Sequence, residues 1–77
     1  MGMINGRLYR LTEIKSFPMY IKLEPIVPEG YFDIPGEDDM MIVEAWCIEH
    51  DCGRRSGWNK FFFADEAKMT MFKLRWS

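Results

Sequence analysis

The chain has 77 residues, a formal net charge of −2, 29% charged residues and 48% apolar residues. This length predicts a single domain over residues 1–77, and the apolar share is too high for a disordered segment. We expect no membrane span, no secretory signal and no disulfide scaffold, and therefore a reduced protein in the cytoplasm.

Two strands are expected in the first third of the chain. Residues 7–14 alternate loosely between apolar and polar. Pro18 then marks a break between elements, because proline also disfavours helix at the residue before it. Residues 19–26 alternate regularly, which is the period of a half-buried strand. The two segments are placed to form a hairpin, and the prolines and glycines from Pro25 to Gly36 predict a loop.

The segment 37–51 fits two structures. Acidic residues at its start, His50 near its end and Gly53 just beyond are typical of a helix. Alternating apolar residues and two β-branched side chains inside the segment also suit a strand. We favour the helix and keep the strand as the alternative.

The last third predicts a strand over residues 58–63 and a helix over 66–75, with Asp65 as the N-cap. This helix has two apolar stripes on roughly opposite sides. One consists of Ala67, Met71 and Leu74, and the other of Met69, Phe72 and Trp76. The order β-β-α-β-α predicts an α+β fold, a small two-layer sandwich with an antiparallel sheet.

Charge is distributed very unevenly along the chain. Residues 23–53 contain nine Asp and Glu and no Lys or Arg, whereas residues 1–22 carry +3 and residues 54–77 carry +4. In one interpretation the acidic middle folds against the basic ends and the charges cancel, as surface pairs commonly do. In the other, a negative lobe and a positive edge persist and steer association with a charged partner.

The helices have more apolar surface than one sheet can cover. The segment 37–51 is apolar on nearly all sides, and the helix after Asp65 has its second stripe. Either the two helices pack on each other, or the excess forms a partner or self-association surface, where aromatic and methionine side chains are enriched. The anchor residues of such a surface are Trp46, Met69, Phe72 and Trp76.

Three side chains are candidate metal ligands: Cys47, His50 and Cys52. Sulfur and imidazole bind zinc, but a structural site needs four ligands and no second Cys/His pair is present. A cysteine nucleophile paired with His50 lacks an orienting group and an oxyanion hole. We therefore expect no catalytic residue, no cofactor and no metal, and keep a small metal protein as a third hypothesis.

Residues 56–63 resemble the third strand of the RNA-recognition motif, in which a basic residue, a glycine and alternating aromatics follow each other. Lys60 occupies a position where that motif has an aromatic. The resemblance implies phosphate contacts from basic side chains and base stacking on aromatic ones. The residues concerned are Arg54, Arg55, Lys60, Phe61 and Phe63.

Two blocks, residues 46–53 and 61–76, resemble small uncharacterised proteins of tailed phages that infect marine cyanobacteria. The first is a helix end with Trp-Cys and a closing glycine. The second is an aromatic strand, an acidic cap and a helix ending in Met-Phe-x-Leu-x-Trp. The resemblance covers roughly a third of the chain and implies a phage origin and a helix over 37–51. It brings no catalytic residues.

These observations favour a non-enzymatic protein-binding module, a phage-encoded accessory or host-takeover protein such as an inhibitor, acting in the host cytoplasm. We expect it to bind a basic surface of a host or phage protein through an acidic segment and an apolar anchor, and to form a homodimer through any anchor left free. The acidic residues are Glu37, Asp38, Asp39 and Glu44. The alternative is a small nucleic-acid-binding protein.

Overall fold

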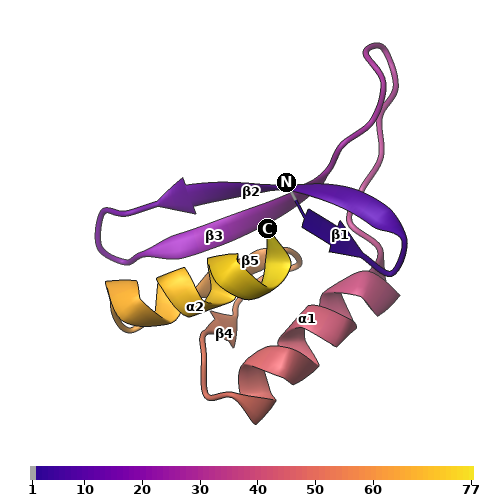
Figure 1. Cartoon of the computed structure of the whole chain (residues 1–77). Helices are drawn as coiled ribbons and strands as arrows, with labels where there is room; N and C mark the ends of the chain where they lie inside the picture. Colours follow the sequence, from indigo (N-terminus) through magenta and orange to yellow (C-terminus); the bar gives the residue numbers. More distant parts are fainter. Residues whose placement is uncertain (1) are drawn as a thin grey trace.

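The computed structural model describes residues 2–77. Its elements follow the order β1 (Gly2–Ile4), β2 (Arg7–Ile14), β3 (Tyr20–Pro25), α1 (Glu37–Glu49), β4 (Arg54–Arg55), β5 (Lys60–Phe62) and α2 (Glu66–Trp76). The strands form one antiparallel sheet in the order β1-β2-β3-β5-β4, and both helices lie on the same side of it (Figure 1). This confirms the predicted α+β two-layer fold.

Both helices begin where the sequence predicts. α1 starts at Glu37 after the extended residue Gly36, so the helix prediction for this segment is confirmed and the strand alternative is wrong. α2 starts after Asp65, whose side chain accepts a 2.9 Å hydrogen bond from the Lys68 backbone N–H. This bond satisfies one of the donors that a helix start leaves free.

Two short strands extend the predicted sheet. β1 pairs with β2 across a turn in which Asn5 and Gly6 have φ angles of 52° and 82°. Asn-Gly is the preferred pair for a tight hairpin because both positions need positive φ. β4 has only two residues and pairs with the edge of β5.

The core lies between the sheet and the two helices. Ile21 and Leu23 of β3 point into it, as their alternation predicts. The helices contribute Met40, Val43 and Cys47 from α1, and Met69, Phe72 and Trp76 from α2. None of the helices in the described part of the chain is long and apolar enough to cross a membrane.

The second stripe of α2 is internal. Met69, Phe72 and Trp76 are 1%, 0% and 4% exposed, and the half-buried Trp46 of α1 packs edge-on against Phe72 and Trp76. The prediction that these four residues form an exposed partner anchor is therefore wrong. Trp46, Phe72 and Trp76 do come together, but as the contact between the two helices, and Met69 lies in the core beside them.

Residues 26–36 form a loop that projects from the sheet on the side away from the helices (Figure 1). Tyr31, Phe32 and Ile34 are 74%, 88% and 57% exposed. The loop leads directly into α1, so its base lies at the first turn of that helix.

Candidate binding surfaces

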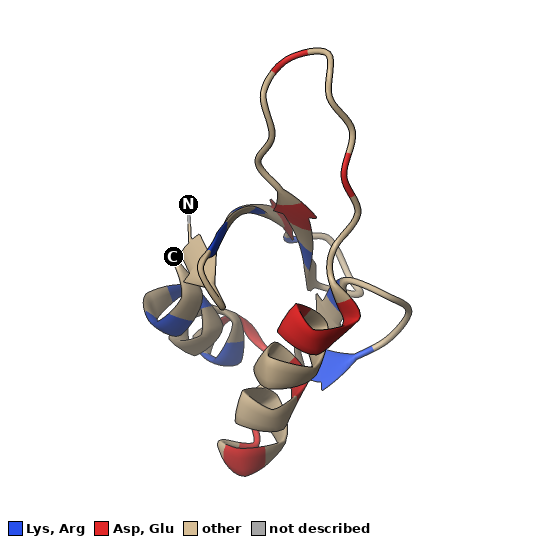
Figure 2. Cartoon of the chain, turned by 90° about the vertical axis from the view of Figure 1, so that its right-hand side faces the viewer, with Lys and Arg blue, Asp and Glu red and all other residues tan. Residues whose placement is uncertain are grey.

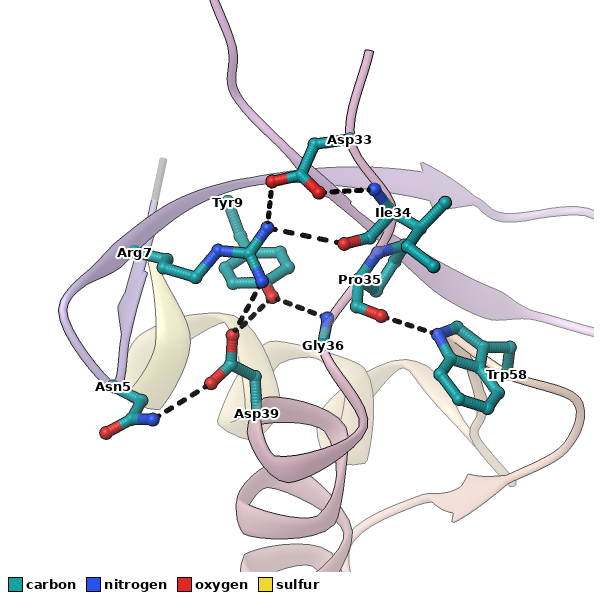
Figure 3. Close-up of polar contacts among 9 residues, drawn as sticks. All are labelled: Asn5, Arg7, Tyr9, Asp33, Ile34, Pro35, Gly36, Asp39 and Trp58. Carbon is teal, nitrogen blue, oxygen red and sulfur yellow. Dashed lines mark hydrogen bonds and ion pairs between the residues drawn. The ribbon is translucent and has the colours of Figure 1, made fainter.

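Asp39, one of the predicted partner-binding residues, is the centre of a buried polar network (Figure 3). It is 3% exposed and accepts hydrogen bonds from the Tyr9 hydroxyl at 2.6 Å, from Arg7 Nη1 at 3.3 Å and from Asn5 Nδ2 at 3.2 Å. Burial, and next the hydrogen bond to Asp39, raises the pKa of Tyr9. The prediction that Asp39 contacts a partner is wrong, because its carboxylate is occupied inside the chain.

The same network fixes the base of the projecting loop. Arg7 reaches both Asp33 and the carbonyl oxygen of Ile34, and Trp58 Nε1 donates a 2.7 Å hydrogen bond to the Pro35 carbonyl (Figure 3). The Gly36 N–H donates to the Tyr9 oxygen at 3.2 Å. The loop therefore rises from a fixed base with its apolar residues exposed.

Arg55 engages two of the predicted acidic residues. Its guanidinium lies 3.3 Å from a carboxylate oxygen of Glu37 and 3.3 Å from one of Glu44, and its side chain is only 11% exposed. This pairing supports the interpretation in which the charges of the acidic middle segment and of the basic ends cancel, at least for these three residues. Asp38 remains exposed in the first turn of α1.

The outer face of α1 is apolar with acidic ends. Met41 is 54% exposed, Ile48 is 75% exposed and Ala45 lies exposed between them. These positions, i, i+4 and i+7, form one stripe. Asp38 and Glu49 lie exposed at its two ends, and we call these five residues the outer α1 face.

Of the three candidate metal ligands, Cys47 and Cys52 lie in the core and His50 lies at the surface. Cys47 and Cys52 are free buried thiols, and Cys52 Sγ lies 3.0 Å from the Lys68 carbonyl oxygen, to which it donates. His50 is exposed and its ring stacks on Trp46. Burial raises the pKa of Cys47 to about 12 and also raises that of Cys52. Within residues 2–77 no cluster of three or more Cys, His, Asp or Glu is arranged to hold a metal ion.

The predicted nucleic-acid residues divide between the two faces of the sheet. Phe61 and Phe63 are 0% and 7% exposed and lie in the core, so the prediction that they stack on bases is wrong. Arg55 also turns toward the helices. Phe62 lies on the other face, since side chains alternate along a strand. Three consecutive phenylalanines give no indication of which one faces outward.

The sheet face away from the helices combines aromatic and basic side chains. We define it as the open sheet face, whose aromatic and charged residues are Arg10, Tyr20, Lys22, Glu24, Arg54, Lys60 and Phe62. Tyr20 and Lys22 were not among the predicted site residues, although the regular alternation of residues 19–26 placed both opposite the core. Figure 2 shows acidic residues on α1, on its preceding loop and at the end of β3, and basic residues elsewhere on the sheet and on α2.

Each interpretation of the charge pattern therefore holds in part. Arg55 pairs with Glu37 and Glu44, whereas the outer α1 face keeps its exposed acidic residues and the open sheet face keeps an excess of basic ones. Comparison with known proteins gave no match: no protein-family model, no curated protein and no solved structure is significantly similar to the chain.

Proposed function

We propose that the protein is a non-enzymatic protein-binding module and that it binds through the outer α1 face. The carrying observation is that α1 fills the core with Met40, Val43 and Cys47 and still exposes an apolar stripe on its other side. The partner surface that fits has an apolar centre and basic groups around it.

The charges of α1 support this proposal. All its charged residues are acidic, and its last turn contains no basic residue. An acidic residue near a helix C-terminus is unfavourable with the helix dipole, by about 0.3–1 kcal/mol. Glu49 thus makes α1 less stable and the outer α1 face more negative, which suits association with a basic partner.

The apolar stripe provides the anchor of the proposed interface. Met41 and Ile48 are both more than half exposed, and burying such a side chain contributes about 1.5–3 kcal/mol. This energy is gross, since association also costs translational freedom. Two such side chains with acidic residues at the rim are consistent with a moderate affinity that depends on salt.

The phage origin in this proposal rests on the resemblance of residues 46–53 and 61–76 to cyanophage proteins. We propose a phage-encoded accessory protein that binds a host protein in the host cytoplasm and alters its action. No chemistry by the chain itself is needed for this role.

The test uses one substitution on the outer α1 face and a matched one elsewhere. Ile48→Arg places a basic group in the stripe, and Leu74→Arg does the same at an 81% exposed position on α2. Tagged wild type and both variants are incubated with nuclease-treated cyanobacterial lysate, and the captured protein is then purified and titrated. We expect Leu74→Arg to retain the partner and Ile48→Arg to weaken binding at least about tenfold, or about 1.4 kcal/mol.

Two results would overturn the proposal. In the first, wild type and Ile48→Arg capture the same proteins with the same affinity. In the second, sedimentation shows a wild-type dimer that Ile48→Arg converts to a monomer, which makes the outer α1 face a contact between copies of this chain.

A further inference from the structure

The open sheet face has two neighbouring rows of side chains that run across the strands. Arg54, Phe62 and Tyr20 occupy one row, because Arg54 and Tyr20 are both register partners of Phe62. Lys60 and Lys22 are partners in the next row. Rows two residues apart along a strand are separated by about 7 Å.

The aromatic row offers ring surface to solvent. Tyr20 and Phe62 are half-buried, their ring centroids are 5.0 Å apart and their planes are tilted by 36°. A hollow of about 400 Å³ opens beside Phe62, and Arg54 and Pro18 are among its lining residues. The row therefore combines two adjacent rings with an open space next to them.

The lysine row is unfavourable for the folded chain alone. Lys22 and Lys60 lie directly opposite each other on adjacent strands, and like charges in that position are destabilising. Within residues 2–77, no ion pair includes Lys22, Lys60 or Arg54. Lys60 instead lies over the Tyr20 ring, with Nζ 5.5 Å from the centroid. These charges are left available for an anion.

We propose that the open sheet face binds single-stranded nucleic acid. Two or three bases stack on Tyr20 and Phe62, Lys60 leaves the Tyr20 ring that it covers in the free protein, and the phosphates between and beside the bases contact the lysine row and Arg54. Stacking needs base faces that a duplex keeps covered, so a single strand fits this surface and a duplex does not. The site is separate from the outer α1 face, because the helices lie on the opposite side of the sheet (Figure 1).

The projecting loop borders the same face. A second hollow, of about 420 Å³, lies between the sheet and the loop, and it is lined by Lys22, Tyr31 and Phe32 together with the acidic Glu24 and Asp33. Tyr31 and Phe32 are strongly exposed. The strand that occupies the two rows can thus continue toward two more aromatic rings beside Lys22.

The test measures binding of fluorescently labelled oligo(dT) and oligo(U) by anisotropy at low salt. We expect the logarithm of the association constant to fall with the logarithm of salt concentration, with a slope of about −2 for three phosphate contacts, one each with Lys22, Lys60 and Arg54. Tyr20→Ala and Phe62→Ala should each weaken binding about fivefold or more, as expected for a lost stacking contact.

Charge reversal provides the matched control. Lys60→Glu should weaken binding at least about tenfold. Arg75→Glu makes the same change in net charge on α2 and should leave binding within about twofold. Circular dichroism and thermal melts check that all variants are folded.

Three results would overturn this proposal. These are no binding of either oligonucleotide at low salt, equal losses for Lys60→Glu and Arg75→Glu, and duplex DNA binding as tightly as the single strand. The partner capture described for the outer α1 face uses nuclease-treated lysate, so each proposal can fail without the other.

Discussion

The hydroxyl of Tyr9 donates a 2.6 Å hydrogen bond to Oδ2 of Asp39, and so links the middle of β2 to the first turn of α1. The Tyr9 oxygen also accepts from the N–H of Gly36, the last residue before the helix. One side chain of the sheet therefore fixes the start of the helix and the end of the loop together. This link sets the position of α1 and the direction in which the loop projects.

Asp39→Asn tests the strength of this link. The substitution replaces a carboxylate that accepts charge-assisted and neutral hydrogen bonds in a buried site. We expect the free energy of unfolding to fall by about 2–3 kcal/mol. The neighbouring Asp38→Asn, at an exposed position, should change it by about 0.5 kcal/mol or less. Urea denaturation of both variants gives the comparison, and equal effects would contradict a structural role for Asp39.

Gly53 and Gly57 form a second matched pair. Both have positive φ, 93° and 84°, so alanine is strained at either position. A Cβ at Gly53 would also lie 2.6 Å from Cε1 of Phe63, whereas one at Gly57 meets nothing within 4 Å. We expect Gly57→Ala to lower the free energy of unfolding by about 1 kcal/mol, and Gly53→Ala to lower it by about 1–3 kcal/mol more. Thermal melts that show the two variants equally stable would place Phe63 elsewhere.

The buried thiol of Cys47 predicts a loss of stability at alkaline pH. Burial, and next the charges of Cys52 and Glu44, raises the pKa of Cys47 to about 12, while the unfolded chain releases this proton near pH 9. Since the folded state holds the proton more tightly, its contribution is complete below about pH 9 and falls as pH rises toward 12.

We expect Cys47 alone to reduce the free energy of unfolding by about 1–2 kcal/mol between pH 8 and pH 10. Cys47→Ala removes the titrating group, so its stability should decline less steeply over this interval even though its absolute stability is lower. Urea denaturation at several pH values measures the slopes, and parallel slopes would show that Cys47 does not ionise on unfolding.

Phe61 and Phe62 distinguish the two faces of the sheet. Phe61 is fully buried and packs against Phe72, so Phe61→Ala should cost about 3–5 kcal/mol. Phe62 faces away from the helices and loses mainly its cross-strand contact with Tyr20, so Phe62→Ala should cost about 1 kcal/mol or less. The reverse order would mean that β5 is shifted by one residue.

Local signals in the sequence were enough for most elements of the fold. The alternation of residues 19–26 identified β3 and its buried residues, and Asp65 located the start of α2. The Asn5–Gly6 dipeptide is the local signal for the hairpin that joins β1 to β2, although β1 was not among the predicted strands. β4 has two residues, too few for any periodicity, and is defined only by its pairing with β5.

The binding surfaces were harder to predict because they depend on contacts between distant residues. In the sequence, Asp39 looks like any other acidic residue in the first turn of a helix. Its buried position results from contacts with Tyr9 and Arg7, about 30 residues earlier. The two stripes of α2 are equivalent on a helical projection, so packing against Trp46, Phe61 and Phe63 decides which is internal. The register of three phenylalanines likewise depends on the neighbouring strand.

Gly2 lies directly against the main chain at the end of α2, where a Cβ would meet the Trp76 carbonyl oxygen. The described chain thus begins and ends at one place (Figure 1). A short linker between these ends would make the backbone a closed ring, and the ring can be reopened in the exposed loop around Gly30. Such a circular permutant should keep every strand pairing. Tyr31 and Phe32 stay joined to α1 in it, but they are no longer joined through the loop to β3. It therefore separates what the loop contributes to folding from what it contributes to binding.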